Sequence, residues 1–166
     1  MQIKNKLVIE GPNNVGKSTL IEKIKEETGY SSIHLTAESD NSYNSYLDLI
    51  TGEEPLIMDR SMISEYIYSV LFGREPKLTK KELIKLLQTL QLQKGRVLII
   101  LPKKVSELEK NYKSKGEEFD EEFAIEEFKA YVNLIKELHN DSFNLHNIYV
   151  VYMDDITTKE ELYEYL

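Results

Sequence analysis

The chain has 166 residues, 41% of them hydrophobic and 30% charged, which predicts one globular domain over residues 1–166 with a core of its own. Its net charge of −8 argues against duplex nucleic acid as a partner, and no apolar run is long enough for a signal peptide or a membrane span. The absence of Cys excludes a disulfide framework, a thiolate zinc site and a cysteine nucleophile, and it fits a cytoplasmic location.

The first half of the chain alternates short apolar runs with patterns of helical period. Short runs rich in apolar residues predict strands at residues 7–9, 33–35 and 56–58. Apolar side chains at helical spacing predict helices over residues 18–27, 42–50 and 62–71. Gly29 is the expected C-cap of the first helix, and the third is expected to end near Gly73.

The second half begins with a capping-box pattern at residues 79–82, which predicts a helix through Leu90 that Gly95 closes. Residues 97–101 form the most apolar of the predicted strands, and a last strand is expected at 148–152. The remaining amphipathic patterns predict helices over residues 105–115 and 120–138 and a terminal helix capped by residues 157–160.

About five apolar strands, each followed by one or two helices, predict an α/β fold with a parallel sheet covered on both faces. Ligands of such sheets bind beyond the carboxyl ends of the strands. The motifs that carry chemistry in this sequence all fall at such ends.

The first motif follows the first predicted strand and opens the first helix. Its sequence, Gly-Pro-Asn-Asn-Val-Gly-Lys-Ser over residues 11–18, fits the phosphate-binding pattern G-x-x-x-x-G-K-[ST]. Glycines let the loop curl so that backbone N–H groups and the helix N-terminus point at an anion. Lys17 is expected to reach the transferred phosphoryl group and Ser18 to bind Mg²⁺. We expect ATP to bind at Gly11, Asn13, Asn14, Val15, Gly16, Lys17, Ser18 and Thr19.

A second motif, Asp59-Arg60, ends the third predicted strand. Asp59 is suited to hold Mg²⁺ or its water, or to orient the acceptor, and Arg60 to clamp a phosphate or the transferring group. The plainer alternative is a surface ion pair in which Ser61 merely caps the next helix. The phosphate loop in the same sheet favours the functional interpretation.

Residues 8–20 resemble the opening of thymidylate kinases and deoxynucleoside kinases, and residues 58–68 resemble the Asp-Arg or Glu-Arg motif of those families. The Asp-Arg form is that of the thymidylate kinases. The resemblance implies a three-layer P-loop NTPase fold with strand order 2-3-1-4-5 and a nucleotide kinase activity that uses ATP and Mg²⁺. The small size is similar to that of viral members, for which the location would be the host cytoplasm.

The resemblance also implies a lid-like segment near residues 103–118. The family usually has Arg where this chain has Lys110, Lys113 and Lys115, and Lys lacks the planar fork of Arg. A solvated helix face is the alternative interpretation of these residues.

The acceptor pocket is less defined by the sequence. The resemblance places Arg74 against an acceptor base, and Tyr66 is a further candidate for the acceptor site, although Tyr66 and Phe72 also fit a core stripe. Glu38 and Glu10 are candidates for a catalytic base, which a nucleoside acceptor needs more than an anionic monophosphate does. The three His residues, His34, His139 and His146, fit no motif and are expected to be structural or exposed.

These observations favour an ATP-dependent kinase of deoxynucleoside monophosphates, with Lys17, Asp59 and Arg60 as catalytic residues. A deoxynucleoside kinase and a nucleotide-binding module without catalysis are the alternatives. The partner is expected to be a small nucleotide or nucleoside, and the sequence leaves a homodimer open.

Overall fold

The computed structural model describes residues 6–152, 154–155 and 159–166. Five parallel strands form one sheet in the order β2-β3-β1-β4-β5. The predicted parallel sheet and its strand order are confirmed. The strands are β1 (Lys6–Glu10), β2 (Ser31–His34), β3 (Leu56–Asp59), β4 (Arg96–Leu101) and β5 (Ile148–Tyr152).

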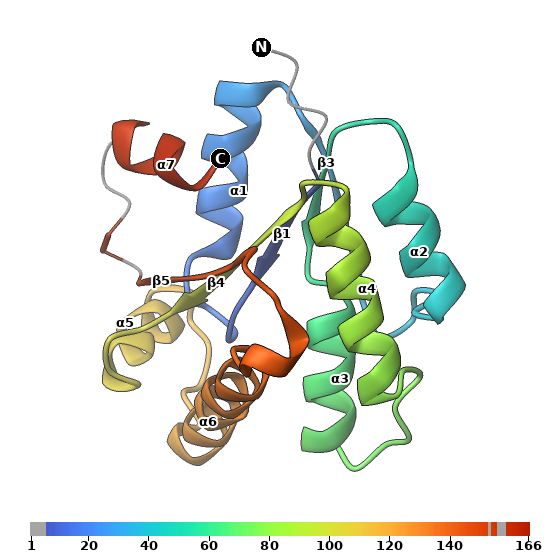
Figure 1. The fold of residues 1–166 in the computed structure, drawn as a ribbon. Coiled ribbons are helices and arrows are strands. Elements are labelled where there is room, and N and C mark those ends of the chain that lie inside the picture. The colour runs from blue at the N-terminus through green and yellow to red at the C-terminus, as the bar shows by residue number, and fades with distance from the viewer. Residues whose placement is uncertain (1–5, 153, 156–158) are drawn as a thin grey trace.

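Helices cover both faces of the sheet, so that the molecule has three layers (Figure 1). Helices α2, α3 and α4 lie on one side and α1 and α7 on the other. The helices are α1 (Lys17–Thr28), α2 (Tyr43–Thr51), α3 (Met62–Leu71), α4 (Lys80–Leu92), α5 (Ser106–Ser114), α6 (Glu121–Leu138) and α7 (Lys159–Tyr165), with a 3₁₀ turn, η1, at Asp141–Phe143.

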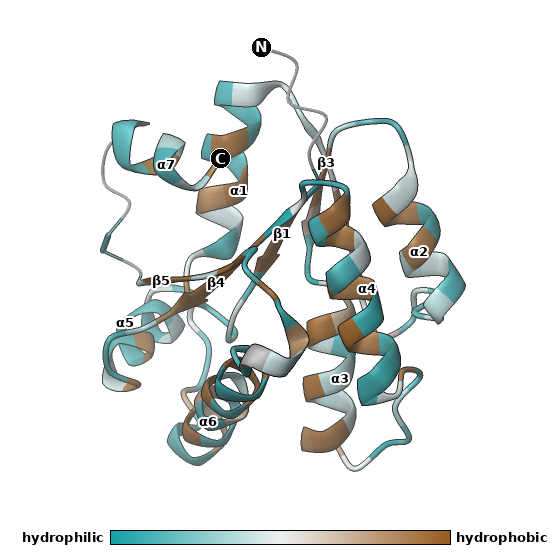
Figure 2. Ribbon diagram, viewed as in Figure 1, coloured by the Kyte–Doolittle hydropathy of each residue, from teal (hydrophilic) through white to brown (hydrophobic). Residues whose placement is uncertain are grey.

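The central strands are apolar on both faces because successive side chains point to opposite layers. In β4, Val97 and Ile99 pack with α2, α3 and α4, whereas Leu98 and Ile100 pack with α1. All five residues of β1 are buried. Buried apolar residues of the helices pack with these strands. Figure 2 shows brown, hydrophobic segments alternating with teal, hydrophilic ones along the helices. The core therefore holds the sheet rigidly and presents its carboxyl edge as a fixed platform.

Most predicted helix ends agree with the structure. Gly29 is the left-handed C-cap of α1, and Thr79 and Glu82 form the expected capping box of α4. Helix α4 ends at Leu92, and Gly95 closes it as expected, because its N–H donates to the carbonyl oxygen of Leu90 at 2.8 Å. The left-handed position, however, is taken by Lys94, with φ of 59°, and not by the glycine. The predicted cap at Thr157 and Thr158 lies outside the described residues.

Within the described part of the chain, none of the helices combines the length and the apolar character that crossing a membrane requires.

Candidate functional site

The loop between β1 and α1 has the backbone that the phosphate-binding pattern requires. Gly11, Asn14 and Gly16 adopt positive φ angles of 141°, 57° and 100°. At Gly11 the reason for glycine is also steric, since a Cβ atom there would lie 2.2 Å from the carbonyl oxygen of Ile100. The loop therefore turns directly over the end of β4 and leads into the N-terminus of α1, where backbone N–H groups are free to bind an anion.

Lys17, the first residue of α1, is almost fully buried. Its Nζ donates to the carbonyl oxygens of Gly11, at 2.9 Å, and Pro12, at 2.5 Å. Burial, reinforced by the charge of Arg60, lowers the pKa of Lys17 to about 8, while the carboxylates of Glu10, Glu127 and Asp59 act in the opposite direction. Keeping the ammonium group charged inside the loop therefore costs free energy, and the negative charge of a bound polyphosphate would offset this cost.

A pocket of about 560 Å³ opens over this loop and is lined by residues 13–19, Lys23 and Asp59, among others. The structure therefore brings most of the expected ATP-binding residues into one cavity, whereas Gly11 does not line it. Ser18 and Asp59, the expected Mg²⁺ ligands, both line it. A hydroxyl and a carboxylate suit Mg²⁺, which commonly takes one or two protein ligands together with phosphate oxygens and water. Among the described residues no group of three or more His, Cys, Asp or Glu side chains is arranged so that it could hold a metal ion.

Asp59 has a partner that sequence reasoning missed. His34 and Asp59 end neighbouring strands and lie opposite each other in the β2–β3 register. The Nδ1 atom of His34 is 2.7 Å from Oδ2 of Asp59. We had expected His34 to be structural or merely exposed, because it fits no motif. The signal that was available is its place at the end of the strand that the order 2-3-1-4-5 sets beside β3.

Arg60 follows β3 in a left-handed conformation, with φ of 68°, which is rare for a side chain of this size. Its guanidinium group donates through Nη2 to Oδ1 of Asn13, at 2.6 Å, and through Nη1 to the hydroxyl of Tyr68, at 3.0 Å. It also lies 5.0 Å from the centre of the Tyr68 ring, within the range of a cation–π contact. Arg60 therefore joins the phosphate loop to α3.

Glu127 on α6 anchors both groups that hold Arg60. The backbone N–H of Asn13 donates to its Oε1 at 3.1 Å, and the Tyr68 hydroxyl donates to the same oxygen. Glu127 is fully buried, and its Oε2 has no hydrogen-bond partner among the described residues. The helical pattern of α6 does not reveal that Glu127 anchors the phosphate loop, because Glu127 and Asn13 are more than a hundred residues apart in the sequence.

A second pocket, of about 290 Å³, lies between the carboxyl end of β2 and α3. Its polar wall contains Glu65 and Arg74, whose side chains form a bidentate pair with distances of 2.7 and 3.0 Å. Asn41, which is nearly buried, accepts from the Tyr46 hydroxyl at 3.0 Å. Tyr68 and Phe72 stack with ring centres 5.8 Å apart and form the aromatic wall. Such a mixture of aromatic surface and few polar groups suits a small planar ligand.

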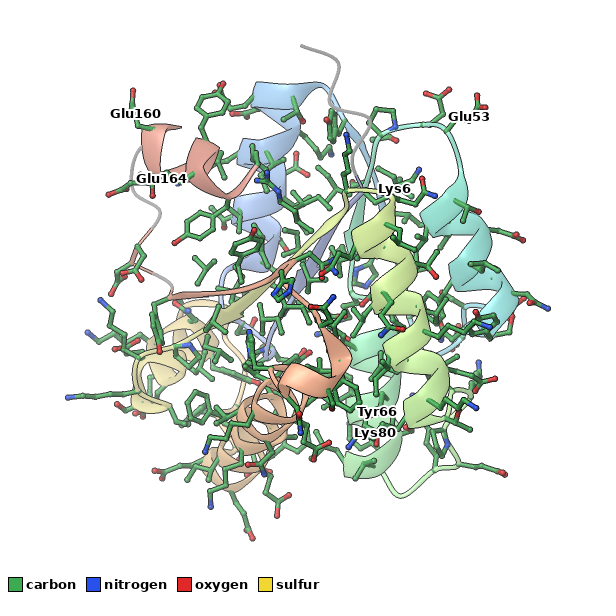
Figure 3. The ribbon with its side chains drawn as sticks, viewed as in Figure 1. Lys6, Glu53, Tyr66, Lys80, Glu160 and Glu164 are labelled. Carbon is green, nitrogen blue, oxygen red and sulfur yellow. The ribbon has the colours of Figure 1, made fainter. Side chains whose placement is uncertain are left out.

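The positions of Tyr66 and Phe72 differ from what the sequence predicts. Phe72 was interpreted as core, but it is 63% exposed and lines the second pocket. Tyr66 lines neither pocket and lies beside Lys80 at the start of α4 (Figure 3). Two residues along a helix turn the side chain by about 200°, so Tyr66 and Tyr68 point in opposite directions.

The two carboxylates considered as bases are also placed apart from the pockets. Glu38 is exposed, in the turn after β2, and lines neither pocket. Glu10 is fully buried and accepts hydrogen bonds from Ser61, Ser64 and Tyr131, at 2.5 to 3.1 Å. Both carboxylate oxygens of Glu10 accept hydrogen bonds, and these bonds connect β1 to the start of α3 and to α6.

Side chains of the lid-like segment hydrogen-bond to Asn14 of the phosphate loop. Lys115 donates to Oδ1 of Asn14 at 2.6 Å, and Asn111 donates to its carbonyl oxygen at 2.7 Å. Lys113 instead pairs with Glu109 on the exposed surface, and Lys110 is exposed and lines neither pocket. Of the three expected lid lysines, the structure brings only Lys115 to the nucleotide pocket.

The two pockets share three lining residues, Asn13, His34 and Arg60. One pocket is thus built around a phosphate loop and the other around an aromatic and polar wall, and they meet at an arginine and a His–Asp pair. The two pockets therefore adjoin at these side chains.

Comparison with known proteins identifies the fold. No protein-family model matches the chain, and no curated protein matches it by sequence. Among solved structures, the YorR protein of Bacillus subtilis in complex with phosphorylated GDP is similar, with a TM-score of 0.78, 19% identity, and coverage of 96% of this chain and 92% of that one. The deoxyadenosine kinase of M. mycoides with products dCMP and a flexible dCDP bound gives a TM-score of 0.56, 18% identity, and coverage of 96% and 95%. A gluconokinase of Sinorhizobium meliloti 1021 gives 0.54, 14% identity, and coverage of 93% and 85%.

At these identities the likeness is one of fold. The chain has the P-loop NTPase fold, with the strand order and the two helical layers found above.

Proposed function

We propose that this chain is an ATP- and Mg²⁺-dependent phosphotransferase whose acceptor is a nucleoside or a nucleoside monophosphate. The observation that carries the proposal is the meeting of the two pockets at Asn13, His34 and Arg60. A phosphate loop alone is compatible with switches and motors, whereas a second pocket that opens onto it provides a place for an acceptor.

In this mechanism the loop amides and Lys17 hold the donor phosphates, and Ser18 and Asp59 hold Mg²⁺ or its water. Arg60 stands where charge develops as the phosphoryl group passes from donor to acceptor. Catalysis then comes from in-line positioning and from neutralisation of charge, without a covalent intermediate. When bound, Mg²⁺ supplies further charge neutralisation at the phosphate oxygens.

The resemblance to thymidylate kinases favours a deoxynucleoside monophosphate as the acceptor. Arg60 supports this form of the proposal, because its guanidinium fork suits an acceptor phosphate. The similar fold of a deoxyadenosine kinase and the His34–Asp59 pair favour the second form, in which the acceptor is an unphosphorylated deoxynucleoside.

The test is an ADP-release assay with Mg·ATP against a panel of deoxynucleosides and deoxynucleoside monophosphates, with Mg·ATP binding measured in parallel by calorimetry. Stimulation of ADP release by any member of the panel, at about 1 s⁻¹ or faster, is expected. Tight Mg·ATP binding with no stimulation by any acceptor would refute the phosphotransferase and support the remaining alternative, a nucleotide-binding module without catalysis.

A further inference from the structure

The phosphate loop contains two consecutive asparagines whose side chains serve different neighbours. Asn13 bonds to Arg60 at the junction of the pockets, whereas Asn14 faces the lid-like segment. Asn14 has a left-handed backbone, with φ of 57°. Asparagine tolerates this conformation, but glycine adopts it at lower cost. The backbone alone would therefore favour glycine at position 14, and the reason for an asparagine must lie in its side chain.

Both polar atoms of the Asn14 amide are used by the lid-like segment. Its Nδ2 donates to Oε2 of Glu117 at 2.8 Å, and its Oδ1 accepts from Nζ of Lys115 at 2.6 Å. An ammonium group only donates hydrogen bonds and a carboxylate only accepts them. These two partners therefore fix the amide in one orientation, with the oxygen toward Lys115 and the NH₂ group toward Glu117.

The turn that carries these partners has a structure of its own. After α5 the chain reverses at Gly116, which has a left-handed φ of 70°. The N–H of Glu117 donates back to the carbonyl oxygen of Tyr112 at 3.0 Å, and the Tyr112 ring packs edge-on against Phe119 with centres 5.3 Å apart. The closed turn thus brings Lys115 and Glu117 to the same amide.

The amide also keeps two opposite charges apart. Lys115 and Glu117 are both exposed and only two residues apart, yet within the described part of the chain neither forms a salt bridge. Asn14 is bonded to both instead. Lys115 lines the nucleotide pocket, and its ammonium group has two further N–H bonds to donate. Without the amide, attraction to Glu117 would draw this ammonium group away from the pocket.

We propose, on the basis of the proposed phosphotransferase function, that Asn14 is a positioning residue. Its amide holds the ammonium group of Lys115 at the rim of the nucleotide pocket, where this charge neutralises part of the charge of the donor phosphates. Glu117 acts one step further away, because it fixes the orientation of the amide.

The test is a double-mutant cycle in which calorimetry measures Mg·ATP affinity and thermal unfolding checks the fold. Asn14→Gly keeps the left-handed backbone and the N–H of the loop but removes the amide, and Lys115→Met removes the ammonium group. Both single variants and the double variant are compared with wild type. Glu117→Gln keeps an oxygen that accepts from Nδ2, whereas Glu117→Ala leaves the amide free to turn.

The chain offers a matched control for each change. Asn144→Gly replaces an exposed asparagine that also has a left-handed backbone, with φ of 51°, in the loop before β5. Lys104→Met replaces an exposed lysine near the start of the lid-like segment. Neither residue lines a pocket, so Mg·ATP affinity should stay within about twofold of wild type in both controls.

We expect Asn14→Gly and Lys115→Met each to weaken Mg·ATP binding about five- to tenfold, and the double variant to lose no more than either single one, since both changes remove the same interaction. Glu117→Gln should bind within about twofold of wild type, and Glu117→Ala about threefold more weakly or worse.

Losses that multiply in the double variant would overturn the proposal, because the two residues would then act independently. Wild-type affinity in Asn14→Gly would also overturn it, as would an equal loss in Glu117→Gln and Glu117→Ala, which would assign the effect to the charge of Glu117. These outcomes leave the proposed function intact. Absence of Mg·ATP binding by the wild-type protein would instead refute the proposed function and this inference with it.

Discussion

Lys17 is predicted to destabilise the free protein, so replacing it by Met should make the protein more stable while it loses ATP binding. The lowering of the pKa of Lys17 from 10.5 to about 8 means that folding disfavours the charged amine. One pKa unit corresponds to about 1.4 kcal/mol, so the cost at pH 7 is about 3 kcal/mol. The variant also loses the bonds to the Gly11 and Pro12 carbonyls, worth about 1 kcal/mol each. A net gain of about 1 kcal/mol is expected at pH 7.

The dependence on pH separates this explanation from a general packing effect. Because the folded pKa is below the unfolded one, the unfolded chain binds more protons between about pH 8 and 10.5. Wild-type stability should therefore rise through this range relative to the Lys17→Met variant. Between pH 7 and 9.5 the unfolding free energy of the wild type should rise by about 2 kcal/mol relative to that of the variant, so that the wild type becomes the more stable protein.

Urea unfolding of both proteins at intervals of pH measures the difference, and calorimetry measures Mg·ATP binding, which should weaken at least about tenfold. Lys25→Met is the control, since Lys25 lies on the same helix but is paired with Glu22 near the surface. A difference that stays constant from pH 7 to 9.5, or a Lys17→Met variant less stable than wild type at pH 7, would refute the reasoning.

Three further predictions concern the backbone of the loop, the junction and the acceptor wall. Gly11→Ala should lower stability by about 2–5 kcal/mol in urea unfolding, whereas Gly29→Ala, which has a positive φ but open space, should cost about 1–2 kcal/mol. Arg60→Lys should reduce kcat about 10²–10³-fold in the ADP-release assay, because a single ammonium group cannot bond to both Asn13 and Tyr68 as the guanidinium group does. The control is Arg96→Lys at the start of β4, for which kcat should be near the wild-type value. Glu65→Gln should change the ratio of kcat/KM between bases about tenfold or more, because it breaks the bidentate pair in the acceptor wall, and an unchanged ratio would contradict that role.

The donor half of the site could be predicted from the sequence because its residues are contiguous. Strand, glycine loop and helix N-terminus follow one another over residues 6–28, so local spacing carries most of the geometry. The same holds for the fold, since apolar runs separated by helical periods specify a parallel sheet without any contact being known. Asp59 and Arg60 were found because they end a strand of that sheet.

The acceptor half was not predictable in the same way, because its residues meet only through the tertiary structure. His34 acquires a role from the strand beside it, and Glu127 from a loop more than a hundred residues away. Phe72 fitted a core stripe because an apolar residue at helical spacing is normally buried, yet it is the C-cap residue that follows α3 and is 63% exposed. Periodicity reports which face of a helix is apolar and does not report where the neighbouring layer ends.

The residues that the sequence did not reveal are those that connect the two pockets. Asn13 and Tyr68 hold the two arms of Arg60, and both donate to the same oxygen of Glu127. A phosphate that takes the particular N–H of Arg60 now donated to Asn13 would displace the Asn13 side chain, while the backbone N–H of Asn13 stays bonded to Glu127 on α6. The phosphate loop and α3 are thus joined through one guanidinium group, whose fork bonds to Asn13 and Tyr68 at the same time, a geometry that the single ammonium group of a lysine would not reproduce.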